Sequence, residues 1–346
     1  MTQAVVVHST APLRISFVGG GTDFPHYFER HGGAVLSATI DRHAHVTLVP
    51  RPDREVRIRS DLGHLVEYHL DDRPAYDGVM DLAKAAIERM GIDRGLEMDI
   101  RSEAPPGSGL GGSSALVTAI VAALAALEGR TLGRDEVARL SYSIERDDLG
   151  IAGGWQDQYA AAFGGFNLLE FSGDGVEVIP VRCRTEDLER LRAHLLLCYT
   201  GAVRTDLGLI DTQIRLYHEG REETMVGMKH LHEMAYEMRA SIEAGDLDAL
   251  GPMLRAAYEN KKRMNPHIAD GTPIERLFDA ALEAGADGAK ICGAGGGGYV
   301  LVACRPERRD AVGTALEDLG GRLADFAFHR DGVRAWNGDR AWRPTP

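Results

Sequence analysis

Residues 105–114, with the sequence PPGSGLGGSS, combine glycines and serines in a way that suits phosphate binding. Glycines let the backbone approach a ligand closely and turn several N–H groups toward it. The Ala-rich pattern that follows predicts a helix, whose positive N-terminal end attracts phosphate. No Gly-Lys-Ser/Thr ends the segment, so it is not a Walker loop. The alternative for this serine–glycine loop is an ordinary turn with a serine N-cap, which would not need so many glycines.

A second glycine-rich segment, the glycine run at Gly293–Gly298, stands between two predicted strands. A dinucleotide-binding loop opens a helix, whereas this one opens a strand, which argues against a Rossmann site. A simple hairpin turn is the alternative, but it needs only two such glycines. We therefore expect a loop packed closely against a ligand or another backbone.

Two further groups of residues are weak signals in isolation. The glycine turn Gly19–Gly21 is followed by Thr22 and Asp23, and an Asp in that place either hydrogen-bonds a sugar hydroxyl or caps the turn. Asp157 is expected at the start of a short helix, where an Asp is also an ordinary first-turn residue. Glu145, twelve residues earlier, is either a metal ligand or a solvated partner of its neighbour Arg146.

The helices and strands that the sequence predicts around these segments indicate an α+β protein, with a strand-rich N-terminal half and a mostly helical C-terminal half. Period-two alternation and glycine breaks predict strands at 11–18, 34–49, 54–60, 95–102, 166–171, 175–181, 194–200, 287–292, 299–304 and 322–329. Helical patterns predict helices at 79–90, 115–128, 135–149, 205–243, 246–263, 273–284 and 306–318.

Composition narrows the function classes. The 346 residues carry a net charge of −13, so nucleic acid and anionic membrane are not expected partners. The N-terminus lacks the pattern of a signal peptide, and the scattered cysteines form no disulfide framework, which together predict a cytoplasmic protein. His43 and His45 would share a strand face, but without a third ligand we do not expect zinc there.

Taken together, these segments resemble the GHMP kinase superfamily, which has three motifs in a fixed order. The matching segments are APLRISFVGGGTDF at 11–24, PPGSGLGGSSA at 105–115 and KICGAGGGG at 290–298. Within the superfamily, the strings PLRISFVGGGTDF, GGWQDQYAAAFGGFN and LLLCYTGAVR most resemble heptose 7-phosphate kinases. The resemblance implies an N-terminal domain of ribosomal-protein-S5-like fold at 1–190 and a ferredoxin-like C-terminal domain at 191–346. The active site would lie between them.

The resemblance also implies roles for individual residues. Asp157 would take the proton of the substrate hydroxyl, and Arg14 would pair with that Asp or with the transferring phosphate. Ser113 would bind Mg²⁺, with Ser114 as the alternative, and Glu145 would be the second ligand. The ATP phosphates would be held by the serine–glycine loop, namely Pro106, Gly107, Ser108, Gly109, Leu110, Gly111, Gly112, Ser113 and Ser114.

The sugar substrate would be met by a further set of residues, namely Gly20, Gly21, Thr22, Asp23, Asp157, Arg204, Gly295 and Gly296. Galactokinase-like members carry Glu and His just before the Thr-Asp of the first motif, where this chain has Gly20 and Gly21. The missing side chains enlarge the sugar end of the pocket and favour a longer or phosphorylated sugar. Candidates to meet a distal phosphate are Arg204, Lys261, Lys262 and Arg263, although the last three also suit a solvated helix end.

We therefore expect an Mg²⁺- and ATP-dependent sugar kinase that phosphorylates the anomeric hydroxyl of a heptose 7-phosphate, giving a 1,7-bisphosphate for nucleotide-sugar synthesis. The nearest alternatives are a kinase of an octose phosphate or of an unphosphorylated sugar of the fucose or galactose type. A catalytically silent sugar- or nucleotide-binding sensor is the alternative of another class. The expected partners are ATP and the sugar phosphate, and a homodimer is left open.

Overall fold

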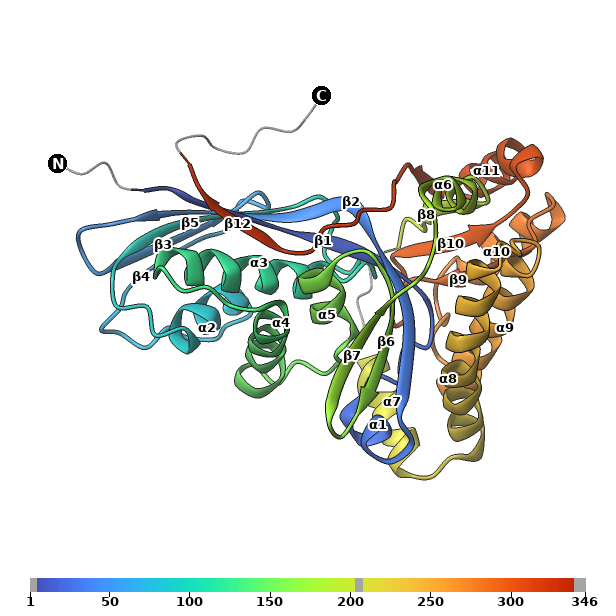
Figure 1. Ribbon diagram of the computed structural model, residues 1–346, viewed down its shortest axis with the longest axis horizontal. Helices are drawn as coiled ribbons and strands as arrows, with labels where there is room; N and C mark the ends of the chain where they lie inside the picture. Colours follow the sequence, from blue (N-terminus) through green and yellow to red (C-terminus); the bar gives the residue numbers. More distant parts are fainter. Residues whose placement is uncertain (1–4, 203–207, 339–346) are drawn as a thin grey trace.

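The computed structural model describes residues 5–202 and 208–338, and it confirms the α+β class. Its larger sheet has the order β12-β1-β2-β5-β3-β4, with β6 and β7 continuing from β2 (Figure 1). All its pairings are antiparallel except that of β3 with β5. The strands are β1 (Val7–Val18), β2 (Gly33–Pro50), β3 (Glu55–Ser60), β4 (Leu65–His69), β5 (Leu96–Ser102), β6 (Phe166–Ser172), β7 (Gly175–Pro180) and β12 (Arg334–Asn337).

Helices gather on one face of this sheet (Figure 1). The central one, α3, is so rich in Ala, Val and Leu that it is buried nearly all round, and it packs on β1 and β2. The serine–glycine loop runs straight into its N-terminus. The elements of this layer are α2 (Asp81–Arg89), α3 (Gly112–Leu127), α4 (Arg134–Ser143), the π-helix η1 (Ile144–Asp148) and α5 (Gln156–Phe163), while α1 (Pro25–His31) contacts β6.

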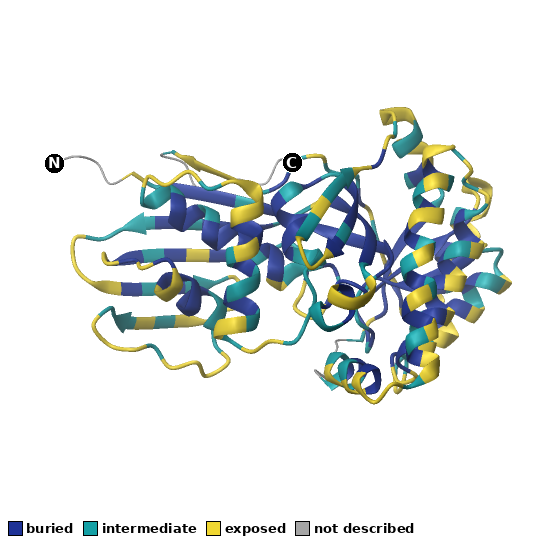
Figure 2. Ribbon diagram, turned by 60° about the horizontal axis from the view of Figure 1, so that its bottom comes forward, coloured by how far each residue is buried: buried dark blue, intermediate teal, exposed yellow. Residues whose placement is uncertain are grey.

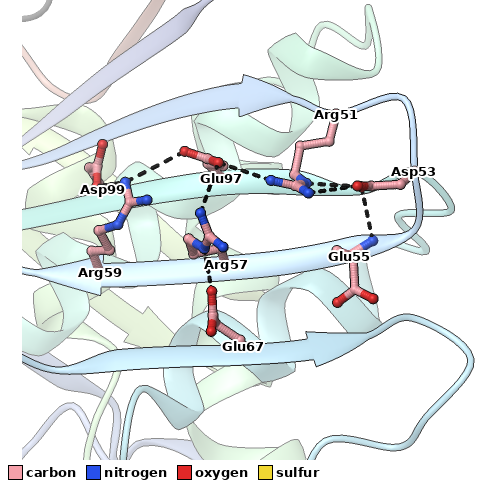
Figure 3. A network of polar contacts seen from close by, with 8 residues as sticks. All are labelled: Arg51, Asp53, Glu55, Arg57, Arg59, Glu67, Glu97 and Asp99. Atoms are coloured by element: carbon pink, nitrogen blue, oxygen red, sulfur yellow. Dashed lines mark hydrogen bonds and ion pairs between the residues drawn. The ribbon is translucent and has the colours of Figure 1, made fainter.

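The opposite face of the large sheet is polar around β3 and β5, whereas most of β1 and the first half of β2 are buried on both faces. Side chains of Arg51, Arg57 and Arg59 form ion pairs with carboxylates on neighbouring strands, and Glu97 in β5 contacts all of these arginines. Figure 3 shows this network in front of the strands, with the helices behind them. Because such exposed pairs contribute little to stability, their main consequence is that this face of the sheet remains hydrated.

The second half of the chain builds a smaller antiparallel sheet with the order β11-β8-β10-β9. Apolar burial is continuous between the sheets, since one core cluster contains residues of both (Figure 2). The remaining elements are α6 (Thr185–Ala193), β8 (Leu195–Tyr199), α7 (Gly208–His218), α8 (Glu222–Glu243), α9 (Leu250–Met264), α10 (Ile274–Glu283), β9 (Gly288–Ile291), β10 (Tyr299–Ala303), η2 (Pro306–Arg308), α11 (Arg309–Asp318) and β11 (Arg322–Ala324).

The structure differs from the expected elements at several places. The helix predicted at 205–243 is two helices, because Gly220 has a φ of 70° between α7 and α8. Strand β12 had no sequence signal, since its residues are exposed and do not alternate. The expected strand at 322–329 is shortened to β11. The division of the chain at 190 and 191 stays a prediction, and it falls inside α6. Within the described residues, no helix combines the length and apolar character that crossing a bilayer requires.

Candidate active site

Arg14 connects the predicted catalytic residues to the serine–glycine loop. It lies on β1, is 4% exposed, and its Nε donates to Oδ1 of Asp157 at 2.8 Å. Its Nη2 lies 2.7 Å from the same oxygen, and its Nη1 donates to the carbonyl of Gly109 at 2.6 Å. The guanidinium therefore holds the carboxylate against the loop through a fixed fork of donors. Asp157 itself stands in the first turn of α5 and keeps 24% of its side chain exposed.

The serine–glycine loop passes directly beside this pair. A Cβ on Gly111 would lie 3.4 Å from Cγ of Arg14 and 3.4 Å from Cγ of Asp157, and the φ of Gly111 is +73°. Only glycine adopts this backbone conformation freely so close to other side chains. Among the described residues, none caps the N-terminus of α3 with its side chain, which leaves the backbone N–H groups of the first turn for a ligand.

The glycine run packs against the serine–glycine loop, backbone to backbone. A Cβ on Gly293 would lie 2.7 Å from Cα of Gly109, closer than any real side chain comes. The N–H of Tyr299 donates to the carbonyl of Ser108 at 2.8 Å. The predicted close approach to another backbone is thus confirmed. Gly295 and Gly296 contact Ile268, since the N–H of Gly296 donates to its carbonyl at 2.8 Å.

Ser114, rather than Ser113, meets Glu145. The hydroxyl of Ser114 donates to Oε2 of Glu145 at 2.7 Å, and both side chains are buried. Gln158, which the sequence analysis missed, donates to both of them. Ser113 is exposed. The alternative ligand named from the sequence is therefore the one that lies beside Glu145.

The pair of Ser114 and Glu145 fits Mg²⁺ in its donor chemistry. Mg²⁺ prefers hard oxygen ligands and is usually held by one or two carboxylates together with substrate phosphates. Glu145 belongs to a π-helix, and such bulges often mark functional sites. In the described part of the chain, no cluster of three or more His, Cys, Asp or Glu side chains could hold a metal alone, and an ion shared with phosphates does not need one.

Asp23 lies inside the protein and joins two of the motifs. Its carboxylate accepts hydrogen bonds from the N–H of Gly21 at 2.9 Å and of Gln156 at 3.1 Å. Burial raises the pKa of this carboxyl above its ordinary value. Thr22 is also fully buried, and its hydroxyl donates to the carbonyl of Gly19 at 2.8 Å. These contacts favour the turn-capping interpretation of Asp23, and a contact with sugar stays a prediction.

The candidate residues for a distal phosphate differ in their surroundings. Lys262 pairs with Glu259 at 3.0 Å and Glu275 at 3.4 Å. Arg263 donates to Oδ1 of Asn260 at 3.1 Å. Lys261 instead faces the glycine turn, because its Nζ lies 3.9 Å from where a Cβ on Gly20 would stand. Arg204 lies outside the described residues.

Lys290 has a buried amine, and its sequence pattern indicated only that it precedes the glycine run. Its Nζ donates to the carbonyl of Ser16 on β1 at 2.6 Å and to that of Ile291 at 2.6 Å. The pKa of this amine is lowered to about 7, mainly by burial and in smaller part by the nearby cations Lys261 and Arg14. A glycine-rich motif drew attention to the loop, but nothing in the sequence indicated that the lysine before it points inward.

Comparison with known proteins identifies the family. The models for the N-terminal and C-terminal domains of GHMP kinases match residues 78–165 and 238–321. The chain is 34% identical to the D-glycero-alpha-D-manno-heptose 7-phosphate kinase of Campylobacter jejuni, over 95% of this chain and 98% of that protein. It is 26% identical to a galactokinase of Lactococcus lactis, over 91% of this chain and 88% of that protein.

Solved structures agree with the sequence relatives. A crystal structure described as a D-glycero-D-manno-heptose 1-phosphate kinase from Bacteroides thetaiotaomicron superposes with a TM-score of 0.78 at 30% identity, covering 97% of this chain and 100% of that one. The two-domain kinase fold expected from the motifs is thereby confirmed. With the glycine run packed on the serine–glycine loop, and that loop beside the pair of Arg14 and Asp157, the chain belongs to the GHMP kinases.

Proposed function

We propose that this kinase transfers the γ-phosphoryl group of ATP to the anomeric hydroxyl of a heptose 7-phosphate, giving a 1,7-bisphosphate. The observation that carries the proposal is the contact of Arg14 with both Asp157 and the carbonyl of Gly109. It puts a carboxylate beside a loop suited to phosphate. The relatives named as heptose phosphate kinases support the choice of sugar.

In the proposed reaction, Asp157 accepts the proton of the anomeric hydroxyl while the hydroxyl oxygen bonds to the γ-phosphorus. The bond from that phosphorus to the β–γ bridging oxygen breaks, and ADP leaves. Arg14 orients the carboxylate and adds positive charge beside the transferring group. The backbone of the serine–glycine loop and the N-terminus of α3 hold the other phosphates. Catalysis of this kind consists mostly of positioning and charge neutralisation.

Ser114 and Glu145 are the residues that we propose hold Mg²⁺, because Ser114 at the start of α3 and Glu145 in η1 bring two oxygen donors together. The ion would neutralise part of the charge on the ATP phosphates. Gln158 keeps the two side chains together through its amide N–H groups. A cytoplasmic location and the division of the chain into two domains near residue 190 also stay predictions.

The second candidate is a kinase of an unphosphorylated sugar, as the galactokinase relative suggests. The relatives named as heptose phosphate kinases favour the sugar phosphate. The room that the sequence predicts at Gly20 and Gly21 is filled at Gly21, where a Cβ would lie 2.8 Å from Nε2 of Gln213 and from Sδ of Met264. A kinase of an octose phosphate stays a further alternative. A silent sensor is the less favoured class, since it would have no use for a carboxylate held beside the serine–glycine loop by Arg14.

The deciding experiment measures ADP release with Mg·ATP against heptose 7-phosphate, sedoheptulose 7-phosphate, mannose, fucose and galactose. Asp157→Asn keeps the shape of the side chain but removes the base, so turnover should fall by about 10²- to 10⁴-fold while ATP affinity changes little. Asp174→Asn, in the exposed turn between β6 and β7, is the matched control and should behave like the wild type.

Each outcome separates the candidates. Turnover of heptose 7-phosphate that disappears in Asp157→Asn supports both the substrate and the base. Near-full turnover by that variant rejects the base. Turnover restricted to an unphosphorylated sugar retains the kinase and rejects the sugar phosphate. ATP binding without any turnover would favour the sensor.

A further inference from the structure

We propose that Lys261 and Gln213 form the subsite that binds the phosphate at the far end of the sugar, and that they select a phosphorylated substrate. The inference rests on the proposed sugar kinase function and adds the residues that recognise the substrate's second anionic group. Gln213 belongs to α7 and Lys261 to the last turn of α9, so both come from the C-terminal half of the chain.

Both side chains meet the glycine turn of the N-terminal half. The Nε2 of Gln213 lies 2.8 Å from where a Cβ on Gly21 would stand, and that glycine has a φ of +107°. The Nζ of Lys261 lies 3.9 Å from the corresponding position on Gly20. Because these glycines carry no side chains, the polar ends of both residues can approach the backbone of the turn closely.

Gln213 points to a ligand through its unsatisfied hydrogen-bonding group. The residue is 6% exposed, yet its Nε2 is buried without a hydrogen-bond partner among the described residues. Buried polar groups in native proteins are nearly always hydrogen-bonded, because an unpaired buried donor loses its hydrogen bonds to water and gains none in the protein. Oε1 of Gln156, whose own amide nitrogen lies 3.5 Å from the same Cβ position on Gly20, is also buried and unpaired in the described chain. Polar groups from separate elements thus converge on one turn.

The charges around the turn favour an anion. Lys261 and Arg14 are close enough to Lys290 to lower the pKa of its amine, so several cations gather here in a chain of net charge −13. Among the described residues beside the turn, the carboxylate of Asp157 is paired with Arg14, and that of Asp23 accepts backbone hydrogen bonds with both oxygens. An ammonium is a compact point charge with three donors, which suits a phosphate group.

The direction of the sugar follows from adjacent residues. Asp157 would face the anomeric hydroxyl beside Gly111, and its neighbour Gln156 reaches the glycine turn at Gly20. A sugar that begins at Asp157 and passes Gln156 therefore arrives at Lys261. Its far end is where a heptose 7-phosphate carries its phosphate, whereas a hexose without that group ends earlier.

The test compares one sugar with and without its phosphate, namely heptose 7-phosphate and free heptose. In Lys261→Met, kcat/KM for the phosphorylated sugar should fall by about 10- to 100-fold, mainly through KM, as for a lost hydrogen bond to a charged group. The value for free heptose should stay near that of the wild type. Lys261→Arg, which keeps the charge, should restore most of the loss. Lys262→Met is the matched control, since Lys262 pairs with Glu259 and Glu275, and it should change neither value.

Gln213→Glu is an independent probe of the same subsite. The substitution keeps the shape and places a carboxylate at the glycine turn, so it should weaken the phosphorylated sugar far more than the free one. Thermal unfolding of each variant separates this effect from a loss of structure.

The failures of the two proposals are distinguishable. If Lys261→Met lowered both substrates equally, the lysine would act on the transferred phosphoryl group or on structure, which would overturn the inference and leave the kinase proposal intact. If Gln213→Glu discriminated like the wild type, the glutamine would have no part in the subsite. If the wild type itself phosphorylated no sugar phosphate, the proposed function would fail first.

Discussion

At the scale of single residues, neighbouring side chains take different roles because a helix turns by about 100° per residue. Ser113 and Ser114 both lie in the first turn of α3, and the sequence offered both as Mg²⁺ ligands. Only Ser114 turns inward to Glu145, and Ser113 faces solvent. The same geometry separates Lys261, which faces the glycine turn, from Lys262 on α9. A sequence motif marks both serines, or both lysines, as candidates. Choosing between them requires knowing which side of the helix each residue faces.

The contact of Ser114 with Glu145 gives a prediction about Mg²⁺ binding. Ser114→Ala should raise the Mg²⁺ concentration for half-maximal activity by on the order of 10-fold, because one oxygen donor is lost from the site. Ser113→Ala should shift it far less. Glu145→Gln should shift it at least as much as Ser114→Ala, since it removes the charge. Titration of activity with Mg²⁺ at saturating ATP measures all three, and equal shifts for the two serine variants would reject Ser114 as the ligand.

At the scale of elements, the active site depends on loops that touch each other through glycine. Gly293 in the glycine run and Gly109 in the serine–glycine loop approach too closely for a Cβ on Gly293. The sequence predicted that the glycine run packs against a ligand or another backbone, because runs of glycine are visible without coordinates and the flanking strands alternate clearly. It did not identify the serine–glycine loop as the neighbour. It could not predict β12, whose exposed residues carry no pattern, or the partners of the glycine turn. Gln213 and Lys261 come from distant helices whose polar residues resemble any solvated helix face.

The loop contact leads to a prediction for Gly293→Ala. The added Cβ would lie 2.7 Å from Cα of Gly109, so backbone must move, and overpacking of this kind costs roughly 1–3 kcal/mol. We expect a lower thermal midpoint and a larger loss of kcat/KM for ATP, because the displaced segment is the serine–glycine loop. In Gly173→Ala the new Cβ meets open space, and both quantities should stay unchanged. An active, fully stable Gly293→Ala protein would show that the loops need not touch.

At the scale of the whole molecule, the two sheets contact each other directly beside the site. Lys290 on β9 of the smaller sheet donates to the carbonyl of Ser16 on β1 of the larger sheet. Near the other end of the chain, β12 returns to pair with β1. The proposed sugar would contact Asp157 from one half and Lys261 from the other. Anything that changes the charge at this junction therefore acts on stability and on the site together.

The buried amine of Lys290 makes stability depend on pH in a defined direction. Its pKa is lowered from 10.5 to about 7 by burial. Below about pH 7, the folded and unfolded chains both carry the proton, so folding bears the full cost of burying a charge. Above it, the folded chain has lost the proton while the unfolded chain still binds it, so the free energy of unfolding rises with pH.

Lys290→Met removes this contribution while keeping an unbranched side chain of similar length. The difference in free energy of unfolding, wild type minus variant, should therefore grow by roughly 1 kcal/mol per pH unit between about pH 7 and pH 9 and level off below that range. Urea unfolding of both proteins across this range measures the difference, in which the other titrating groups largely cancel. A difference that does not change with pH would mean that Lys290 keeps its charge when folded. In that case the carbonyls of Ser16 and Ile291 would hold an ammonium between the two sheets throughout.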